Sequence, residues 1–442
     1  MRGLLLALFV FGSTPWMLRV PFVGLLFWMW LGFMNPHRLT FGWAFSFQWV
    51  QWVAGATILG WLFSREPRRI PMTGTTAVWI AFTLWATLTT LFALNPVDAW
   101  PEWQRFIKVQ VMILFMLLML VSRERLNLVV IVIVTSICFY GVKGGIFTIL
   151  GGGQYMVWGP PKSFMSGNTE LGFALVIVVP LLWYLRGIAT HRWIRWGCVA
   201  AFGLCLISIL GSYSRGAFLA LAAMVFFLWL RSRGKILTGL AALAALAIGL
   251  SLMPDQWFDR MGTIQNFEQD GSAMGRINAW WFAFNLANDH PIVGGGFRAF
   301  SAELFLRYAP EPENFKDAHS IIFEVLGEQG YVGLLLFLAL GLATFLRAWR
   351  IEWMVKGRED LAWAASLARM CQVALVGYLV GGAFLGLAYF DLPYAIMAIV
   401  IATGAVAQRQ LASRVGEPQA EWRAAIAPPA PVPMTQTADG RS

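Results

Sequence analysis

The sequence predicts an all-α protein that crosses a membrane many times and carries a large helical loop outside it. Of 442 residues, 58% are hydrophobic and only 13% are charged. The apolar residues form runs close to the ~20 residues that a helix needs to cross a bilayer. Trp and Phe are abundant, with 23 and 34 residues, and many Trp residues lie near the ends of these runs, where aromatic side chains anchor helices in the interface. Short clusters of Arg and Lys separate the runs.

The apolar runs give the order of the expected helices. We place membrane spans near residues 43–63, 74–94, 102–121, 126–150, 170–186, 193–211, 216–231, 235–253, 330–350, 370–389 and 391–410. Residues 3–34 are also apolar, but Pro15, Arg19 and Pro21 divide them into two short pieces. A single crossing there gives about 12 spans with both termini cytoplasmic, and two crossings give about 13 with an external N-terminus.

The basic clusters predict the orientation, because loops rich in Arg and Lys stay in the cytoplasm. These clusters lie around residues 65–69, 123–125, 186–195, 231–235, 347–358 and 409–423. The segments between them, 95–101, 151–169, 211–215 and 254–329, are then expected in the periplasm of a bacterium, with the chain in the inner membrane. The net charge of +10 follows from these clusters. We therefore expect membrane lipids as neighbours and no nucleic acid as a partner.

Two segments lie outside the expected spans. Residues 254–329 contain eleven Asp and Glu and five Arg and Lys, and their apolar spacing predicts a helical periplasmic cap. This cap and the spans form one expected domain, residues 1–411. Residues 412–442 are polar and rich in Pro, which predicts a disordered cytoplasmic tail.

Arg215 is the first candidate site residue. It lies in the string GSYSRGAF at the outer end of one span, where the next span begins. A guanidinium in this place can bind a phosphate through two parallel hydrogen bonds, and the hydroxyls of Tyr213 and Ser214 lie beside it. The alternative is an arginine that reaches to the lipid headgroups.

Arg276 is the second candidate. In GRINAWWFAF it stands at the expected start of a helix, where the helix end and the guanidinium both favour anions. The alternative is a solvated surface arginine. Downstream, the turn GGGFRAF at residues 294–300 resembles a phosphate cradle, although it lacks the strand that precedes such turns in dinucleotide sites.

His319 is the candidate base. It precedes an expected span in KDAHSIIFEVLGEQG and is followed by Glu324 and Glu328. Two acids near one imidazole can orient it and raise its basicity. With an unperturbed pKa of about 6.5, an imidazole can take a proton from a sugar hydroxyl as that hydroxyl attacks. A histidine that caps a helix is the structural alternative.

Further polar residues lie in or near the outer segments. Lys162 and Asn168 precede one span, and Arg105 and Lys108 lie near the start of another. Arg105 and Lys108 either face the same phosphate pocket or form a salt bridge with Glu102. No DxD or HExxH arrangement appears outside the membrane, so we expect neither a metal nor another cofactor.

Together, SYSRGAF, the long outer loop with GR and GGGF, and AHS followed by GEQGYVG resemble the O-antigen ligase and polymerase family of Wzy-like membrane glycosyltransferases, over residues 160–400. The stretch PFVGLLFWMWLGFMNPHRLTFGWAF also resembles probable O-glycosylation ligases found beside exosortase systems.

The resemblance implies an inverting, metal-independent transfer at the periplasmic face. The donor is a glycan on undecaprenyl pyrophosphate and the acceptor a lipid A core sugar, another glycan or a protein. It implies that Arg215 and Arg276 hold the pyrophosphate and that His319 activates or aligns the acceptor hydroxyl. A ligase, a polymerase and a protein O-oligosaccharyltransferase of the same fold remain alternatives. A transporter or flippase is favoured less, because no internal repeat is visible and Lys143 is one of few charges within a run.

Overall fold

The computed structural model describes residues 1–232, 234–262 and 271–426, and within these ranges all regular structure is helical. The first part contains α1 (Arg2–Arg19), α2 (Pro21–Met34), η1 (Pro36–Leu39), α3 (Trp43–Ser46), α4 (Trp49–Phe63), α5 (Gly74–Leu91), α6 (Pro96–Met119), α7 (Arg123–Leu150), α8 (Asn168–Ile188), α9 (Arg192–Gly211) and α10 (Arg215–Arg231). The remaining elements are α11 (Lys235–Ser251), α12 (Asp255–Gly262), α13 (Gly271–Asp289), α14 (Ala302–Tyr308), α15 (Ile321–Met354), η3 (Glu359–Leu361), α16 (Ala362–Gly382) and α17 (Asp391–Ile426).

Seven of the described helices are long and apolar enough to cross a membrane, or eight if the bent pair α11 and α12 forms one span. The seven are α5, α7, α8, α9, α15, α16 with η3, and the part of α17 up to Ser413. The expectation of a helical protein with many spans is therefore confirmed. The other expected spans correspond to shorter or more polar helices, so the number of about 12 stays a prediction.

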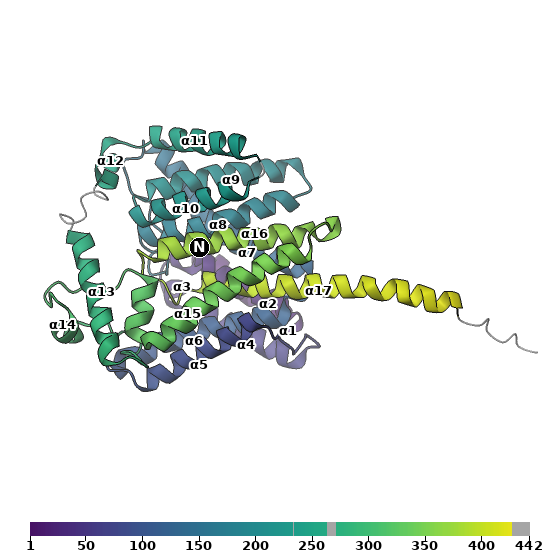
Figure 1. The fold of residues 1–442 in the computed structure, drawn as a ribbon, viewed down its shortest axis with the longest axis horizontal. Helices are drawn as coiled ribbons and strands as arrows, with labels where there is room; N and C mark the ends of the chain where they lie inside the picture. Colours follow the sequence, from purple (N-terminus) through teal and green to yellow (C-terminus); the bar gives the residue numbers. More distant parts are fainter. Residues whose placement is uncertain (233, 263–270, 427–442) are drawn as a thin grey trace, which may run out of the picture.

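The spans pack as a bundle of roughly parallel and antiparallel helices, and α13 and α14 lie beyond one of its ends (Figure 1). Close contacts between helices depend on small residues, as is usual where helices pack inside a membrane. A Cβ atom on Gly145 of α7 would lie 2.2 Å from the carbonyl oxygen of Leu204 in α9. One on Gly381 of α16 would lie 2.5 Å from the ring of Phe173 in α8.

The two N-terminal helices run in opposite directions along the bundle. The start of α1 lies beside the segment that follows α2, since a Cβ atom on Gly3 would lie 2.7 Å from that of Ala44. The end of α1 lies near the end of α4, since a Cβ atom on Gly60 would lie 2.7 Å from the carbonyl oxygen of Leu18. Pro15 therefore does not interrupt α1, whose break comes at Val20. Neither α1 nor α2 is among the helices long and apolar enough to span a membrane, so the number of crossings in residues 3–34 stays a prediction. With 14 residues, α2 is about 21 Å long, shorter than a typical span.

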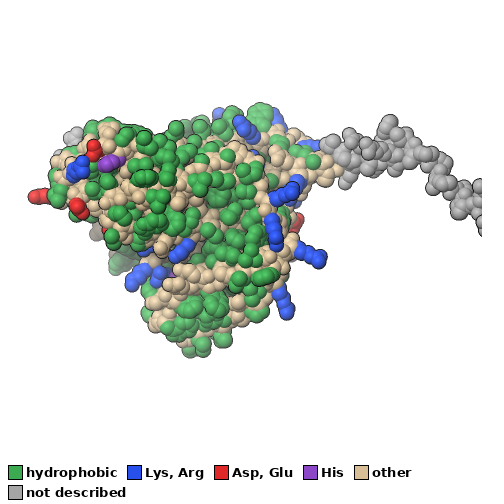
Figure 2. All heavy atoms as spheres, turned by 90° about the horizontal axis from the view of Figure 1, so that it is seen from below, with side chains coloured by type: hydrophobic (Ala, Val, Ile, Leu, Met, Phe, Trp, Pro, Cys, Tyr) green, Lys and Arg blue, Asp and Glu red, His purple; other side chains and the backbone are tan. Residues whose placement is uncertain are grey.

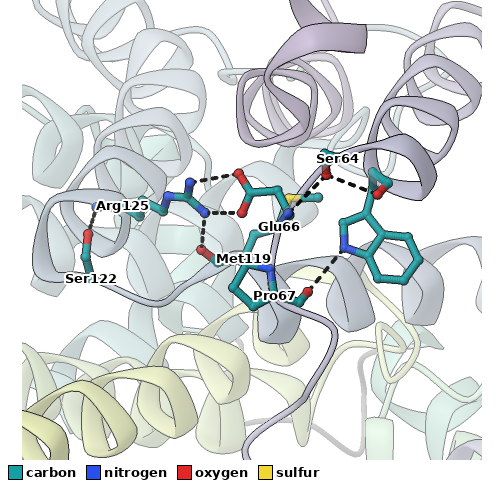
Figure 3. Close-up of polar contacts among 7 residues, drawn as sticks. Ser64, Glu66, Pro67, Met119, Ser122 and Arg125 are labelled. Carbon is teal, nitrogen blue, oxygen red and sulfur yellow. Dashed lines mark hydrogen bonds and ion pairs between the residues drawn. The ribbon is translucent and has the colours of Figure 1, made fainter.

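The basic clusters meet acids at the end of the bundle opposite α13. Glu66 lies between α4 and α5, and Arg125 at the start of α7 binds both its carboxylate oxygens, at 2.7 and 2.8 Å (Figure 3). Likewise, Glu352 accepts from Arg369 at 3.0 Å and pairs with Arg231 at 3.1 Å. On the face in Figure 2, hydrophobic side chains cover the middle of the bundle and several Lys and Arg side chains gather at the end from which α17 extends.

Two expectations about the segments outside the spans can be compared with the fold. The cap is helical in its described residues, as predicted, and it begins where α12 turns by 115° from α11. At the C-terminus, α17 continues to Ile426, beyond the residue where the tail was expected to begin. Residues 427–442 lie outside the described residues, so the disorder of the tail stays a prediction.

Candidate functional site

The loop between α16 and α17, residues 383–390, brings two candidate segments together. A Cβ atom on Gly216, directly after Arg215, would lie 3.5 Å from the Cβ of Phe384 in this loop. One on Gly386 of the same loop would lie 3.5 Å from the backbone nitrogen of His319. Arg215 and His319 therefore belong to the same end of the bundle, although 104 positions separate them (319 − 215). We call it the site end.

Arg215 begins α10, after a turn whose polar groups are largely engaged. Ser214 caps the helix by accepting from the backbone N–H of Ala217 at 3.2 Å. Tyr213 is buried, has a φ of 56°, and donates its hydroxyl to the carbonyl of Gly153 at 2.7 Å. Arg260 of α12 donates to the carbonyl of Tyr213 at 3.0 Å. The hydroxyls expected to bind substrate thus help to position the turn that carries Arg215.

Asn168 also supports this turn. Its side-chain amide donates to the carbonyl of Ser212 at 2.6 Å, which joins the start of α8 to the end of α9. The structure therefore places Asn168 beside the Arg215 turn, and its expected role in substrate binding stays a prediction.

Arg276 lies close to His319. Burial lowers the pKa of His319 below its usual value, the positive charge of Arg276 lowers it further, and the charge of Asp317 opposes both. The helix α13 is fastened to this segment because Trp280 donates to the carbonyl of Ala318 at 2.8 Å and its ring stacks on Phe323 at 5.0 Å.

The helical position of Arg276 differs from the prediction. The described part of α13 begins at Gly271, so Arg276 lies in the second turn and not at the first residue of the helix. The unpaired N–H groups of a helix belong to its first turn. The charge of the guanidinium, and not the end of the helix, is what Arg276 brings to His319.

Glu324 and Glu328 hold backbone segments around the site. Glu324 accepts from the N–H of Ala388 at 3.0 Å, in the loop 383–390. Glu328 is buried and accepts from the N–H of Arg298 at 2.8 Å. Their spacing from His319 suggested contact with the imidazole, but α15 begins only at Ile321 and His319 has a φ of 43°, so helical spacing does not extend back to it. Asp317 is the acid whose charge raises the pKa of His319.

The Gly-rich turn packs against the start of α15. The N–H groups of Gly295 and Gly296 donate to the carbonyls of Gly327 and Glu328, each at 2.8 Å. Gly330, at the break inside α15, has a φ of 68°, and a Cβ there would lie 2.4 Å from the carbonyl oxygen of Ile292. Because the N–H groups of Gly294, Gly295, Gly296 and Arg298 are bonded within the protein, the turn acts as a packing element and its resemblance to a phosphate cradle is misleading.

The other cations expected near the phosphate are exposed, and two of them contact other residues of the protein. Arg105 forms an ion pair with Glu102 at 2.7 Å, and its side chain is 71% exposed. Glu102 also binds Arg298, at 2.8 Å from Nε. Lys108 is exposed on α6, one turn beyond Arg105. Lys162 is exposed as well, with its Nζ 5.6 Å from the centre of the Phe45 ring. Arg105 therefore forms the salt bridge with Glu102, which was one of its two expected arrangements.

The sequence reasoning missed the loop 383–390, Asp317 and Arg298. Asp317 stands two residues before His319, and that closeness was an available signal. The loop is a short uncharged connection between two apolar runs, so nothing in its composition marked it. Within the described residues, no three His, Cys, Asp or Glu side chains gather as metal ligands would.

Two family models match parts of the chain. Residues 1–190 match a family of unknown function, DUF5935. A search of the curated proteins found no match. Residues 200–338 match the O-antigen ligase family, Wzy_C, and this segment contains Arg215, Arg276 and His319. The resemblance to exosortase-associated ligases stays a prediction. Members of the matched family are membrane glycosyltransferases or ligases. Residues 200–338 are therefore similar to the O-antigen ligase family, the family that their motifs resemble.

Proposed function

We propose that this protein transfers a glycan from undecaprenyl pyrophosphate to the lipid A core oligosaccharide, at the periplasmic face of the bacterial inner membrane. One observation carries the proposal. The start of α10 at Arg215 and the segment with His319 before α15 both contact the loop 383–390, and the charge of Arg276 lowers the pKa of His319. The site end then faces the periplasm, which agrees with basic clusters at the other end.

The proposed reaction is a single displacement. The acceptor hydroxyl oxygen attacks the anomeric carbon from the face opposite the pyrophosphate, and the bond between that carbon and the pyrophosphate oxygen breaks. The bonding electrons leave with the pyrophosphate, the configuration inverts, and the hydroxyl proton moves to the imidazole of His319. Arg215 and Arg276 stabilise the charge on the leaving group, which a metal does in other enzymes.

The surroundings of His319 suit a proton acceptor. Burial and the charge of Arg276 lower its pKa, so the imidazole is neutral near pH 7. A neutral imidazole has a free nitrogen lone pair that can take the proton. The positive φ of His319, 43°, is uncommon for a residue other than glycine and occurs often at functional sites.

Single substitutions test the roles of these residues. In a purified transfer assay with a lipid-linked glycan, Arg215→Ala, Arg276→Ala and His319→Ala are each expected to lower the rate about 100-fold or more. Arg307→Ala and His290→Ala are matched controls, since both residues lie in the same outer segment and contact Asp289. The controls should keep transfer within about threefold of the wild type. Full transfer by all three folded site variants would refute the assignment.

The acceptor requires its own experiment. The same donor is offered in parallel to lipid A core, to a free glycan of the donor type and to a protein substrate. Modification of lipid A core supports the ligase. Extension of the glycan identifies a polymerase, and modification of Ser or Thr identifies a protein O-oligosaccharyltransferase. Movement of the donor across a membrane without transfer would favour a flippase.

A further inference from the structure

A second basic site lies at the site end of the bundle, formed by the N-terminal part of the chain. A hollow of about 420 Å³ is lined by residues that include Arg2, Arg38, Phe45 and Pro161. They come from the start of α1, from the segment between α2 and α4, and from the loop before α8. Three stretches of chain far apart in sequence therefore build one cavity.

Two cations lie near the ring of Phe45, which lines the hollow. The guanidinium carbon of Arg38 is 4.9 Å from the ring centre, and the Nζ of Lys162, next to Pro161, is 5.6 Å from it. Arg38 donates from Nη1 to the carbonyl of Phe45 at 3.3 Å. Its Nε is buried and has no hydrogen-bond partner among the described residues. The guanidinium is thus oriented by the protein, and a ligand in the hollow would be bound by the remaining N–H groups of Nη1 and Nη2.

No acid balances these charges. None of the residues that line the hollow is Asp or Glu. Within the described ranges, no ion pair joins Arg2, Arg38 or Lys162 to an acidic side chain. The neighbouring His37 responds to the same field, because burial and the charge of Arg38 lower its pKa to about 4. Cations held together without an acid favour an anionic ligand.

We propose that this hollow binds a phosphate ester, at a site separate from Arg215, Arg276 and His319. An arginine fork can hold two phosphate oxygens and a lysine adds a point charge. The ester belongs either to a phospholipid headgroup or to a soluble phosphate compound. The segment that follows Pro161 also contacts the loop 383–390, since the ring of Phe164 lies 4.7 Å from that of Phe390. The proposal does not depend on the transfer reaction.

The test measures binding to the full chain in a neutral detergent. The two probes are inorganic phosphate, followed by equilibrium dialysis, and phosphatidylglycerol against phosphatidylcholine, followed by native mass spectrometry. The variants are Arg38→Gln, Lys162→Gln and the two combined. The control is Arg19→Gln, an exposed arginine at the other end of α1.

The wild type and Arg19→Gln should bind at least one of the two probes equally well, and the double variant about tenfold or more weakly. Binding of phosphatidylglycerol alone identifies a lipid headgroup as the ligand, and binding of inorganic phosphate as well identifies the phosphate group itself. If Arg38→Gln fails to fold, Lys162→Gln replaces an exposed side chain and should still weaken binding measurably. Three results would overturn the proposal. The wild type binds neither probe, or Lys162→Gln and the folded double variant bind as well as the wild type, or Arg19→Gln weakens binding as much as they do.

Discussion

The charge of Arg276 in α13 lowers the pKa of the His319 imidazole, and the charge of Asp317 raises it. The two neighbours therefore act in opposite directions on the residue that we propose as the base. A base must be neutral to accept a proton, so its activity falls as the pH drops through its pKa.

This opposition predicts two opposite shifts in the pH profile. The wild-type transfer rate should fall on the acid side with a midpoint below 6.5, because burial and Arg276 lower the pKa of His319. Arg276→Gln removes a positive charge and should move the midpoint to higher pH. Asp317→Asn removes a negative charge and should move it to lower pH. The measurement is kcat/KM for the donor against pH, which reports the free enzyme, and only the position of the acid limb is compared.

A structural role for His319 gives a different result. If the imidazole merely supports the fold, both variants keep the wild-type midpoint even where their maximal rates differ. Shifts in the same direction would also contradict the assignment, since opposite charges were removed.

Close packing between α7 and α9 gives a stability prediction. Gly145→Ala places a Cβ 2.2 Å from the backbone oxygen of Leu204, and backbone cannot rotate away as a side chain can. We expect a loss of about 1 to 3 kcal/mol in the free energy of unfolding, measured in detergent. Gly203→Ala in α9 is the matched control, because a Cβ there meets nothing within 4 Å. It should be neutral or slightly stabilising, since alanine favours helix by ~1 kcal/mol. Equal stability of the two variants would show that α7 and α9 do not touch at Gly145.

The sequence revealed the spans and the candidate charges more readily than the contacts between them. Apolar runs located α5, α7, α8 and α9 within a few residues, because hydrophobic length is a local property. Arg215 stood out because it lies in a short turn between two apolar runs, and His319 because the chain has only four histidines. The bond from Ala388 to Glu324 joins residues 64 positions apart, and no local pattern encodes such a pair. Helical spacing suggested that Glu324 and Glu328 contact the imidazole of His319, but His319 precedes α15 and does not follow that spacing.

The ion pair between Glu66 and Arg125 is expected to fasten the opposite end of the bundle. Both carboxylate oxygens are bound, and Arg125 also donates to the carbonyl of Met119 at 3.1 Å (Figure 3). The side chain of Arg125 is 26% exposed and that of Glu66 is 12% exposed. Arg125→Ala should therefore lower the free energy of unfolding by about 1 to 3 kcal/mol, partly because Glu66 loses its partner.

A double-mutant cycle with Glu66→Ala isolates the pair. We expect a coupling of about 0.5 to 3 kcal/mol, whereas Arg65→Ala, at a nearby exposed arginine, should stay within about 0.5 kcal/mol of the wild type. The transfer rate per folded molecule should be unchanged, because this pair lies at the end opposite His319. Additive effects of the two alanine substitutions would mean that the ion pair contributes no net stability.

His37 predicts how stability depends on acid. Burial and the charge of Arg38 lower its pKa from 6.5 to about 4, so the folded protein resists a proton that the unfolded chain accepts. Stability is therefore retained above pH 6.5 and falls as the pH drops toward 4, by at most about 2 kcal/mol between pH 7 and 5. His37→Asn should remove this part of the loss, measured as unfolding free energy at the two pH values. The same loss in wild type and variant would contradict it.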